Sequence, residues 1–185
     1  MTRYRILPES SSLSIEARSS LHPIHGRAEG LEGFAEVEIR DGQFDLSVPP
    51  RARLELPVER LRSGNALQDH EMLRRIDARR YPTVTAELRG VTPGAQPGQF
   101  RLLTDLTFHG IARRFEVEVA GSVVAGGDRL GVDGVFELDV RSFEVAPPRF
   151  LGLQVHPEVK IRVQLVLAPA AAEARPGEPT AVPPA

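Results

Sequence analysis

Residues 115–119 read Phe-Glu-Val-Glu-Val, and this alternation of apolar and acidic side chains decides the fold. Successive side chains of a β-strand point to opposite faces, so residues 115, 117 and 119 share a dry face. Glu116 and Glu118 then share a wet face. A slip of one residue would bury both carboxylates, so this register is strongly constrained. We therefore expect an inward-facing apolar row on this strand.

The same period of two recurs along most of the chain. Alternating stretches predict strands at about residues 12–18, 34–40, 83–91, 100–108, 113–124, 129–140 and 157–167. Only one stretch, about residues 65–80, has a helical pattern; it begins at Asn65 and ends before Tyr81-Pro82. A single helix cannot cover so many dry strand faces, so the sheet must close on itself or fold into two layers. We predict an all-β fold, an antiparallel β-barrel of about eight strands with one main helix.

Composition limits the domain organisation and the partners. The 185 residues suit one domain, which we expect over residues 1–168, followed by a disordered tail rich in Ala and Pro over residues 169–185. A net charge of −2, scattered charges and only 5% aromatic residues argue against nucleic-acid binding. The chain has no Cys, and it shows neither a secretory signal nor an apolar run of transmembrane length. We therefore expect a cytoplasmic protein that is not embedded in a membrane.

The five histidines are the main candidates for metal binding or catalysis, and they do not form a local motif. His22 and His25 are three residues apart, which places them on opposite faces of an extended strand and makes a poor metal pair. No nucleophile elbow, phosphate-binding loop, dinucleotide fingerprint or zinc-protease motif is present. The sequence thus predicts a protein that is not an enzyme and that carries no cofactor or metal.

The residues from Asp69 to Thr85, DHEMLRRIDARRYPTVT, resemble the signature of the YceI-like family, in which a short helix precedes Tyr/His-Pro and a strand with Ile/Val-Thr. Three further stretches resemble the family pattern in the same order: His22–Phe34, Leu102–Arg114 and Leu138–Phe143. The resemblance covers about residues 4–167. It implies an extended, lipocalin-like barrel whose apolar tunnel holds a polyisoprenoid or a similar long-chain amphiphile. The chain departs from the family pattern at Tyr4, where a Trp is usual, and after Ser142, where an Asp is missing.

These observations favour binding, sequestration or transport of a long-chain lipid, such as a polyisoprenoid, an isoprenoid quinone or a fatty-acid-like molecule. Each buried methylene contributes about 0.8 kcal/mol, so ten to fifteen of them bind tightly without any catalytic group. Two other hypotheses stay open: a His-dependent metal- or haem-binding barrel, and a packed-core interaction protein, including a homodimer through an edge strand. The expected apolar contacts to the lipid are Leu102, Leu106, Phe108, Phe115, Val117, Val119, Phe136, Leu138, Val159, Ile161 and Val163, and the expected polar contacts to its head are His22, His109 and Arg141.

Overall fold

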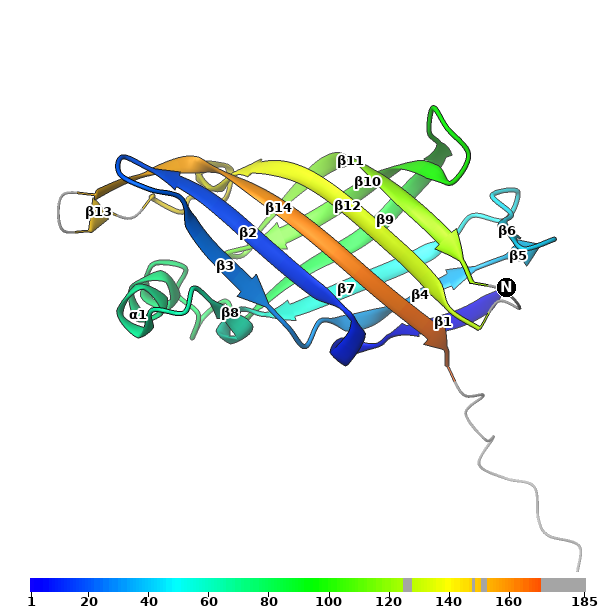
Figure 1. Ribbon diagram of the computed structural model, residues 1–185, viewed down its shortest axis with the longest axis horizontal. Helices are drawn as coiled ribbons and strands as arrows, with labels where there is room; N and C mark the ends of the chain where they lie inside the picture. The colour runs from blue at the N-terminus through cyan, green and yellow to red at the C-terminus, as the bar shows by residue number, and fades with distance from the viewer. Residues whose placement is uncertain (125–127, 148, 151–152, 171–185) are drawn as a thin grey trace, which may run out of the picture.

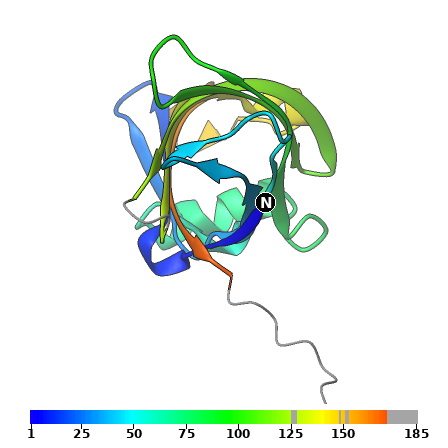
Figure 2. The same cartoon turned by 90° about the vertical axis from the view of Figure 1, so that its right-hand side faces the viewer.

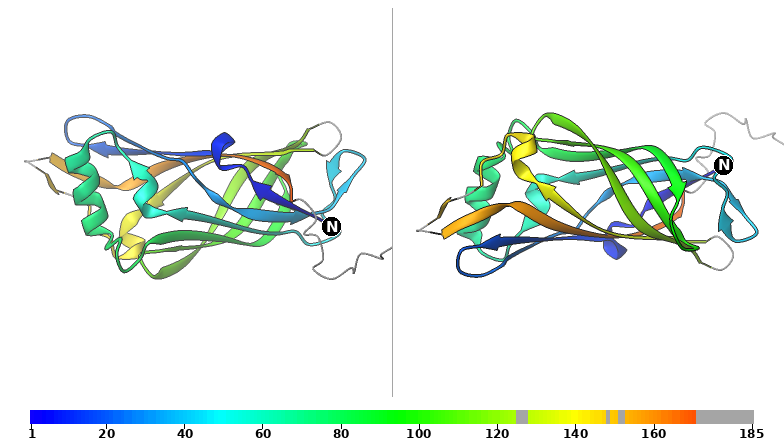
Figure 3. Two further views of the ribbon diagram at one scale, coloured as in Figure 1. Left: turned by 90° about the horizontal axis from the view of Figure 1, so that it is seen from below. Right: turned by 90° about the horizontal axis from the view of Figure 1, so that it is seen from above.

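The computed structural model describes residues 1–124, 128–147, 149–150 and 153–170. Its strands form one closed barrel that is elongated along its axis, with the helix lying across one end (Figures 1, 2 and 3). Every strand pair in this part of the chain is antiparallel, so the predicted all-β barrel with one main helix is confirmed. In chain order the elements are β1 (Thr2–Ile6), η1 (Pro8–Ser10), β2 (Ser12–Ser19), β3 (Ile24–Ala28), β4 (Glu32–Val37), β5 (Ile39–Arg40), β6 (Gln43–Phe44), β7 (Arg51–Pro57), η2 (Val58–Arg60), β8 (Leu61–Arg62), α1 (Ala66–Arg75), β9 (Thr83–Pro93), β10 (Gln99–Phe108), β11 (Ile111–Val123), β12 (Leu130–Asp139), η4 (Val140–Phe143), β13 (Arg149–Phe150) and β14 (Leu153–Pro169).

The barrel wall consists of eight long strands, three of which are interrupted. β1 with β2, β4 with β3, and β7 with β8 each act as one broken strand, and β9 to β12 follow in order. The last strand, β14, pairs with β12 along one edge and with both β1 and β2 along the other. At the point of closure Leu167 lies opposite both Ile6 and Leu130. The wall is thereby closed, which leaves the apolar rows facing a common interior.

Two of the interrupted strands show how the wall stays continuous: one by a side-chain hydrogen bond and one by a close backbone approach. Where β1 gives way to β2, the buried Ser11 hydroxyl accepts a hydrogen bond from the Val166 N–H at 3.0 Å, and the Leu7 N–H donates to the Val166 carbonyl at 2.8 Å. A side chain thus replaces a missing backbone partner of β14. On β4, Gly33 has φ +144°, and a Cβ atom there would collide with the Arg53 carbonyl oxygen on β7. Only glycine permits this approach.

The helix begins as predicted and ends earlier than predicted. The Asn65 side-chain oxygen caps α1 by accepting two backbone N–H groups of the first turn, at 3.0 and 3.2 Å. The helix then stops at Arg75 rather than near residue 80. Asp77 adopts a left-handed conformation with φ 46°, and the Ala78 N–H bonds back to the Leu73 carbonyl at 3.0 Å. This is the Schellman type of helix ending, built here on an aspartate rather than on a glycine.

The β5–β6 hairpin lies at the end of the barrel opposite α1 (Figure 1). The hairpin turns at Asp41-Gly42, both with positive φ (52° and 73°), as the sequence predicts for this dipeptide. Its Phe44 packs edge-to-face against Phe100 on β10, with ring centroids 5.3 Å apart. An aromatic pair thus holds the hairpin against the barrel wall at this end.

Charged residues on the outer wall form a continuous lattice across four strands. Arg53 contacts Glu87 at 2.7 Å, Arg89 contacts Asp105 at 2.7 Å, and Arg114 reaches the same Asp105 at 2.7 Å. The hydrogen bonds from Arg114 and then Arg89 lower the pKa of Asp105 to about 2. The carboxylate therefore stays ionised in any ordinary buffer, and the wet face predicted from the strand period is a network of matched charges.

The C-terminal strand runs slightly beyond the domain boundary predicted at residue 168. β14 continues to Pro169, which lies opposite Tyr4, and the Ala170 N–H donates to the Arg3 carbonyl at 2.8 Å. The tail predicted over residues 169–185 otherwise lies outside the described residues.

A candidate ligand-binding tunnel

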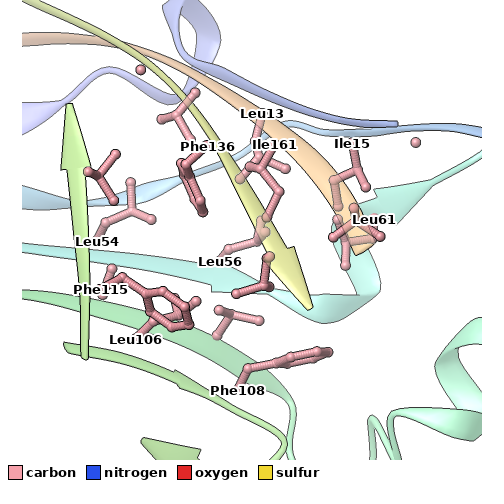
Figure 4. Close-up of a pocket in the computed structure, with 18 of the residues that line it drawn as sticks. Leu13, Ile15, Leu54, Leu56, Leu61, Leu106, Phe108, Phe115, Phe136 and Ile161 are labelled. Carbon is pink, nitrogen blue, oxygen red and sulfur yellow. The ribbon is translucent and has the colours of Figure 1, made fainter. Parts of the chain in front are cut away.

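The inward-facing rows do not fill the barrel. They enclose a tunnel of about 500 Å³, a volume within the roughly 300–1,000 Å³ range of small-molecule sites. Figure 4 shows aliphatic and aromatic side chains from opposite walls, such as Leu54, Phe115 and Ile161, pointing into the same space. All eleven apolar residues that the sequence assigned to the lipid contact line this tunnel: Leu102, Leu106, Phe108, Phe115, Val117, Val119, Phe136, Leu138, Val159, Ile161 and Val163.

The carboxylates between these rows face outward, as the alternation requires. The side chains of Glu116 and Glu118 are 61% and 78% exposed, and both contact Arg101 on the neighbouring strand, at 3.1 and 3.4 Å. Val117, between them, lies opposite Leu102 and lines the tunnel. The predicted register of β11 is therefore confirmed.

Several tunnel residues were not assigned to the site from the sequence. Ala35 on β4 and Phe44 on β6 belong to short strands whose alternation is brief, and their inward direction depends on how the broken strands close. Met72 and Ile76 come from the apolar stripe of α1, which was a helical signal and not a strand signal. Leu67, from the same stripe, is 58% exposed instead and does not line the tunnel.

The three predicted polar contacts do not line the tunnel. His22 is exposed on the turn between β2 and β3, where its Nδ1 lies 3.1 Å from the Pro23 carbonyl oxygen. His109 sits in the β10–β11 turn with φ 51°; its Nδ1 lies 3.0 Å from the Phe143 carbonyl oxygen, and its ring packs on Tyr81 with centroids 4.8 Å apart. Both histidines stabilise turns in these positions.

Arg141 lies beside the tunnel and not in it. Its guanidinium binds the Asp139 carboxylate at 2.6 Å and borders a second hollow of about 410 Å³. Arg75, at the end of α1, borders both spaces, and so do Ala146, Pro147 and Val155. The second hollow therefore adjoins the mouth of the tunnel.

Polar side chains gather at the α1 end of the tunnel, which makes this end its mouth. α1 directs Gln68, Glu71 and Arg75 toward the interior, and His25 on β3 and His156 on β14 border the same space. The helix is held in place by buried Asp69, which accepts hydrogen bonds from the Ser63 N–H and hydroxyl, both at 2.7 Å. These two hydrogen bonds tie the start of α1 to the end of β8, so the polar side chains that α1 brings to the mouth have a defined position.

Within the described part of the chain, no three His, Cys, Asp or Glu side chains lie close enough together to hold a metal ion. The five histidines are spread over two turns, α1 and the strands β3 and β14. Among the same residues, no helix is long and apolar enough to span a membrane.

Solved structures confirm the likeness of the fold. The protein BcnA of Burkholderia cenocepacia superposes with a TM-score of 0.72 at 20% identity, over 87% of this chain and 98% of that one. A polyisoprenoid-binding domain from Saccharophagus degradans, implicated in plant cell wall breakdown, also superposes with a TM-score of 0.72, at 12% identity over 92% of this chain and all of that one. A Campylobacter jejuni YCEI protein gives 0.63 at 11% identity, over 80% of this chain and 85% of that one. At these identities the likeness shows the fold alone.

No curated protein sequence matches the chain. The model of the YceI-like domain, in contrast, matches residues 4–167, which is nearly the whole of the described barrel and includes every strand that lines the tunnel. The elongated barrel, the short helix at its mouth and the order of the sequence motifs agree with that match. The chain therefore belongs to the YceI-like domain family.

Proposed function

We propose that this protein binds a long-chain apolar molecule in its tunnel and carries or sequesters it, without catalysing a reaction. The observation that carries the proposal is a tunnel of about 500 Å³ whose wall is made of inward apolar rows and whose polar lining gathers at one end. The S. degradans structure, a relative in fold, is a polyisoprenoid-binding domain, which supports a polyisoprenoid or an isoprenoid quinone as the ligand. A fatty-acid-like lipid fits the same chemistry.

The tunnel favours a molecule with one long chain and one polar head. Its deep part offers aliphatic and aromatic side chains, so a polar head there would lose its hydrogen bonds to water without replacement. The mouth offers Gln68, His25 and His156, and the adjoining hollow offers the guanidinium groups of Arg75 and Arg141. We therefore place the chain in the tunnel and the head at the mouth, with Arg141 at the edge of the head site.

Native mass spectrometry of the purified protein, followed by organic extraction, tests the proposal directly. The expected result is a bound species of defined mass that is released by solvent and that chromatographs as a long-chain lipid. A protein that carries no lipid and that also fails to bind fluorescent chain probes would contradict the proposal.

Filling the tunnel tests the same proposal by mutation. Ala86→Phe and Val119→Phe both add a ring inside the tunnel. We expect each to weaken binding of a long-chain probe by tenfold or more and to leave the free energy of unfolding nearly unchanged, because the ring enters empty space. In a packed core the same changes would cost about 1–3 kcal/mol.

The neighbouring residues on the same strands provide matched controls. Thr85→Phe and Ala120→Phe add the same ring, and neither of these residues lines the tunnel. Probe binding should equal that of the parent protein in both controls. Strong destabilisation by the inward rings with unchanged binding would show that the tunnel is not the site.

A further inference from the structure

The mouth of the tunnel carries the two most exposed large apolar side chains in the described part of the chain. Leu21, at the tip of the β2–β3 hairpin, is 77% exposed, and Leu67, on the first turn of α1, is 58% exposed. The hairpin tip and α1 lie at the same end of the barrel in both side views (Figures 1 and 3). The following helix residue, Gln68, lines the tunnel, so Leu67 stands next to its opening, and Leu21 lies at the same end of the barrel.

Leu21 is displayed by an ordered turn and not by an irregular loop. The Ser19 hydroxyl accepts hydrogen bonds from the N–H groups of Leu21 and His22, at 3.4 and 3.2 Å, and donates one to the His22 carbonyl. The braced turn holds Leu21 outward, where its side chain gains nothing from burial within the protein but can gain it by entering another apolar phase. The position is therefore suited to contact with an apolar phase.

Positive charge surrounds these leucines. The mouth segments 18–27, 58–82, 109–113, 139–147 and 153–158 together contain ten arginines against seven carboxylates, although the whole chain has a net charge of −2. Arg18, Arg62, Arg79 and Arg80 are exposed and make no ion pair with the described residues. On the outer wall, Arg53, Arg89, Arg101 and Arg114 are paired with carboxylates, but Arg5, Arg51 and Arg162 are exposed and pair with no carboxylate in the described chain, so the mouth is set apart by its excess of three positive charges. The unmatched cations at the mouth complement an anionic surface.

We propose that the mouth end docks on a lipid bilayer that contains anionic headgroups, with Leu21 and Leu67 inserted at the interface and the unpaired arginines against phosphate oxygens. Docked in this way, the tunnel opens toward the acyl chains, and a lipid chain passes between bilayer and tunnel without crossing water. Short apolar anchors combined with a basic collar are the two signals that give stable but reversible membrane attachment. The inference goes beyond lipid binding itself, since a carrier could also exchange its ligand with another protein.

Vesicle flotation at low and high salt tests this inference. The parent protein should float with vesicles of phosphatidylcholine and phosphatidylglycerol, and much less with phosphatidylcholine alone. High salt should weaken the attachment, because each arginine near an anionic surface contributes about fivefold in affinity. The double variant Leu21→Ser/Leu67→Ser should bind the anionic vesicles at least tenfold more weakly, and it should take up a chain probe from them more slowly.

The matched control removes exposed apolar groups elsewhere. Val124, at the opposite end of the barrel, and Val135, on the β12 wall, are 50% and 44% exposed, so Val124→Ser/Val135→Ser should float like the parent. Binding of a water-dispersed chain probe should be equal in all three proteins, which separates docking from the tunnel itself. Equal flotation of both double variants, or no flotation of the parent with any vesicle, would overturn the inference. The inference would also be overturned if the parent were a dimer that bound no vesicles and that became monomeric only in the Leu21→Ser/Leu67→Ser variant. The leucines would then contact a second copy of the chain.

Discussion

Val117→Asp abolishes binding of a long-chain probe and lowers the free energy of unfolding by about 3 kcal/mol or more, because it places an unpaired carboxylate inside an apolar tunnel. The loss should be largest at neutral pH. It should be partly recovered as the pH falls toward 4, because the aspartate pKa is raised in the tunnel and its protonated form costs less to bury. Chemical denaturation across this pH range and a probe titration measure both effects.

Glu118→Lys is the matched control for this substitution. It also changes charge on β11, but the Glu118 side chain is 78% exposed and contacts Arg101 at 3.4 Å. An exposed pair of this kind contributes at most about 1 kcal/mol, and Glu116 still faces Arg101 after the change. Stability and probe binding should therefore stay close to those of the parent. Equal damage from both substitutions would contradict the inward and outward assignment of the strand.

Affinity should rise about fourfold with each methylene added to a ligand chain and then level off. Each buried methylene contributes about 0.8 kcal/mol, so five additional methylenes strengthen binding by about a thousandfold while the tunnel still has room. Once the chain fills the tunnel as far as Phe44, at the end away from the mouth, further methylenes stay in water and add nothing. A homologous series with one common head, measured by displacement of a fluorescent probe, shows both the slope and the plateau.

The position of the plateau can be moved by mutation. Ala86→Phe shortens the free length of the tunnel, so its plateau should come at a shorter chain than that of the parent, whereas Thr85→Phe should leave the plateau in place. Affinities that do not depend on chain length would mean that the chain lies outside the tunnel.

The sequence predicted the wall of the tunnel well, because alternation has a strict period and any slip buries charge. Val117 and its neighbours could be assigned to a face from five residues alone. The same argument applies to Val159, Ile161 and Val163 on β14, where Lys160 and Arg162 alternate with them. Local sequence therefore determined which side chains face inward.

The mouth could not be predicted in the same way, because its residues meet only through long-range closure. His25 borders the tunnel and His22 does not, and the difference is made by the Ser19-braced turn that precedes β3. Arg141 binds Asp139 two residues away, and only the closed fold brings it to the same hollow as Arg75. The helix end was missed because Asp77, and not a glycine, adopts the left-handed conformation there.

The empty tunnel also has a volumetric consequence. Unfolding lets water into every internal void, so the system shrinks as the chain unfolds, typically by about 20–100 mL/mol in proportion to the void that is eliminated. A bound chain fills part of the tunnel of about 500 Å³, so the contraction on unfolding should be smaller with the ligand than without it. Hydrostatic pressure should therefore unfold the empty barrel readily, and a chain that occupies the tunnel should make the protein pressure-resistant even where its heat stability changes little.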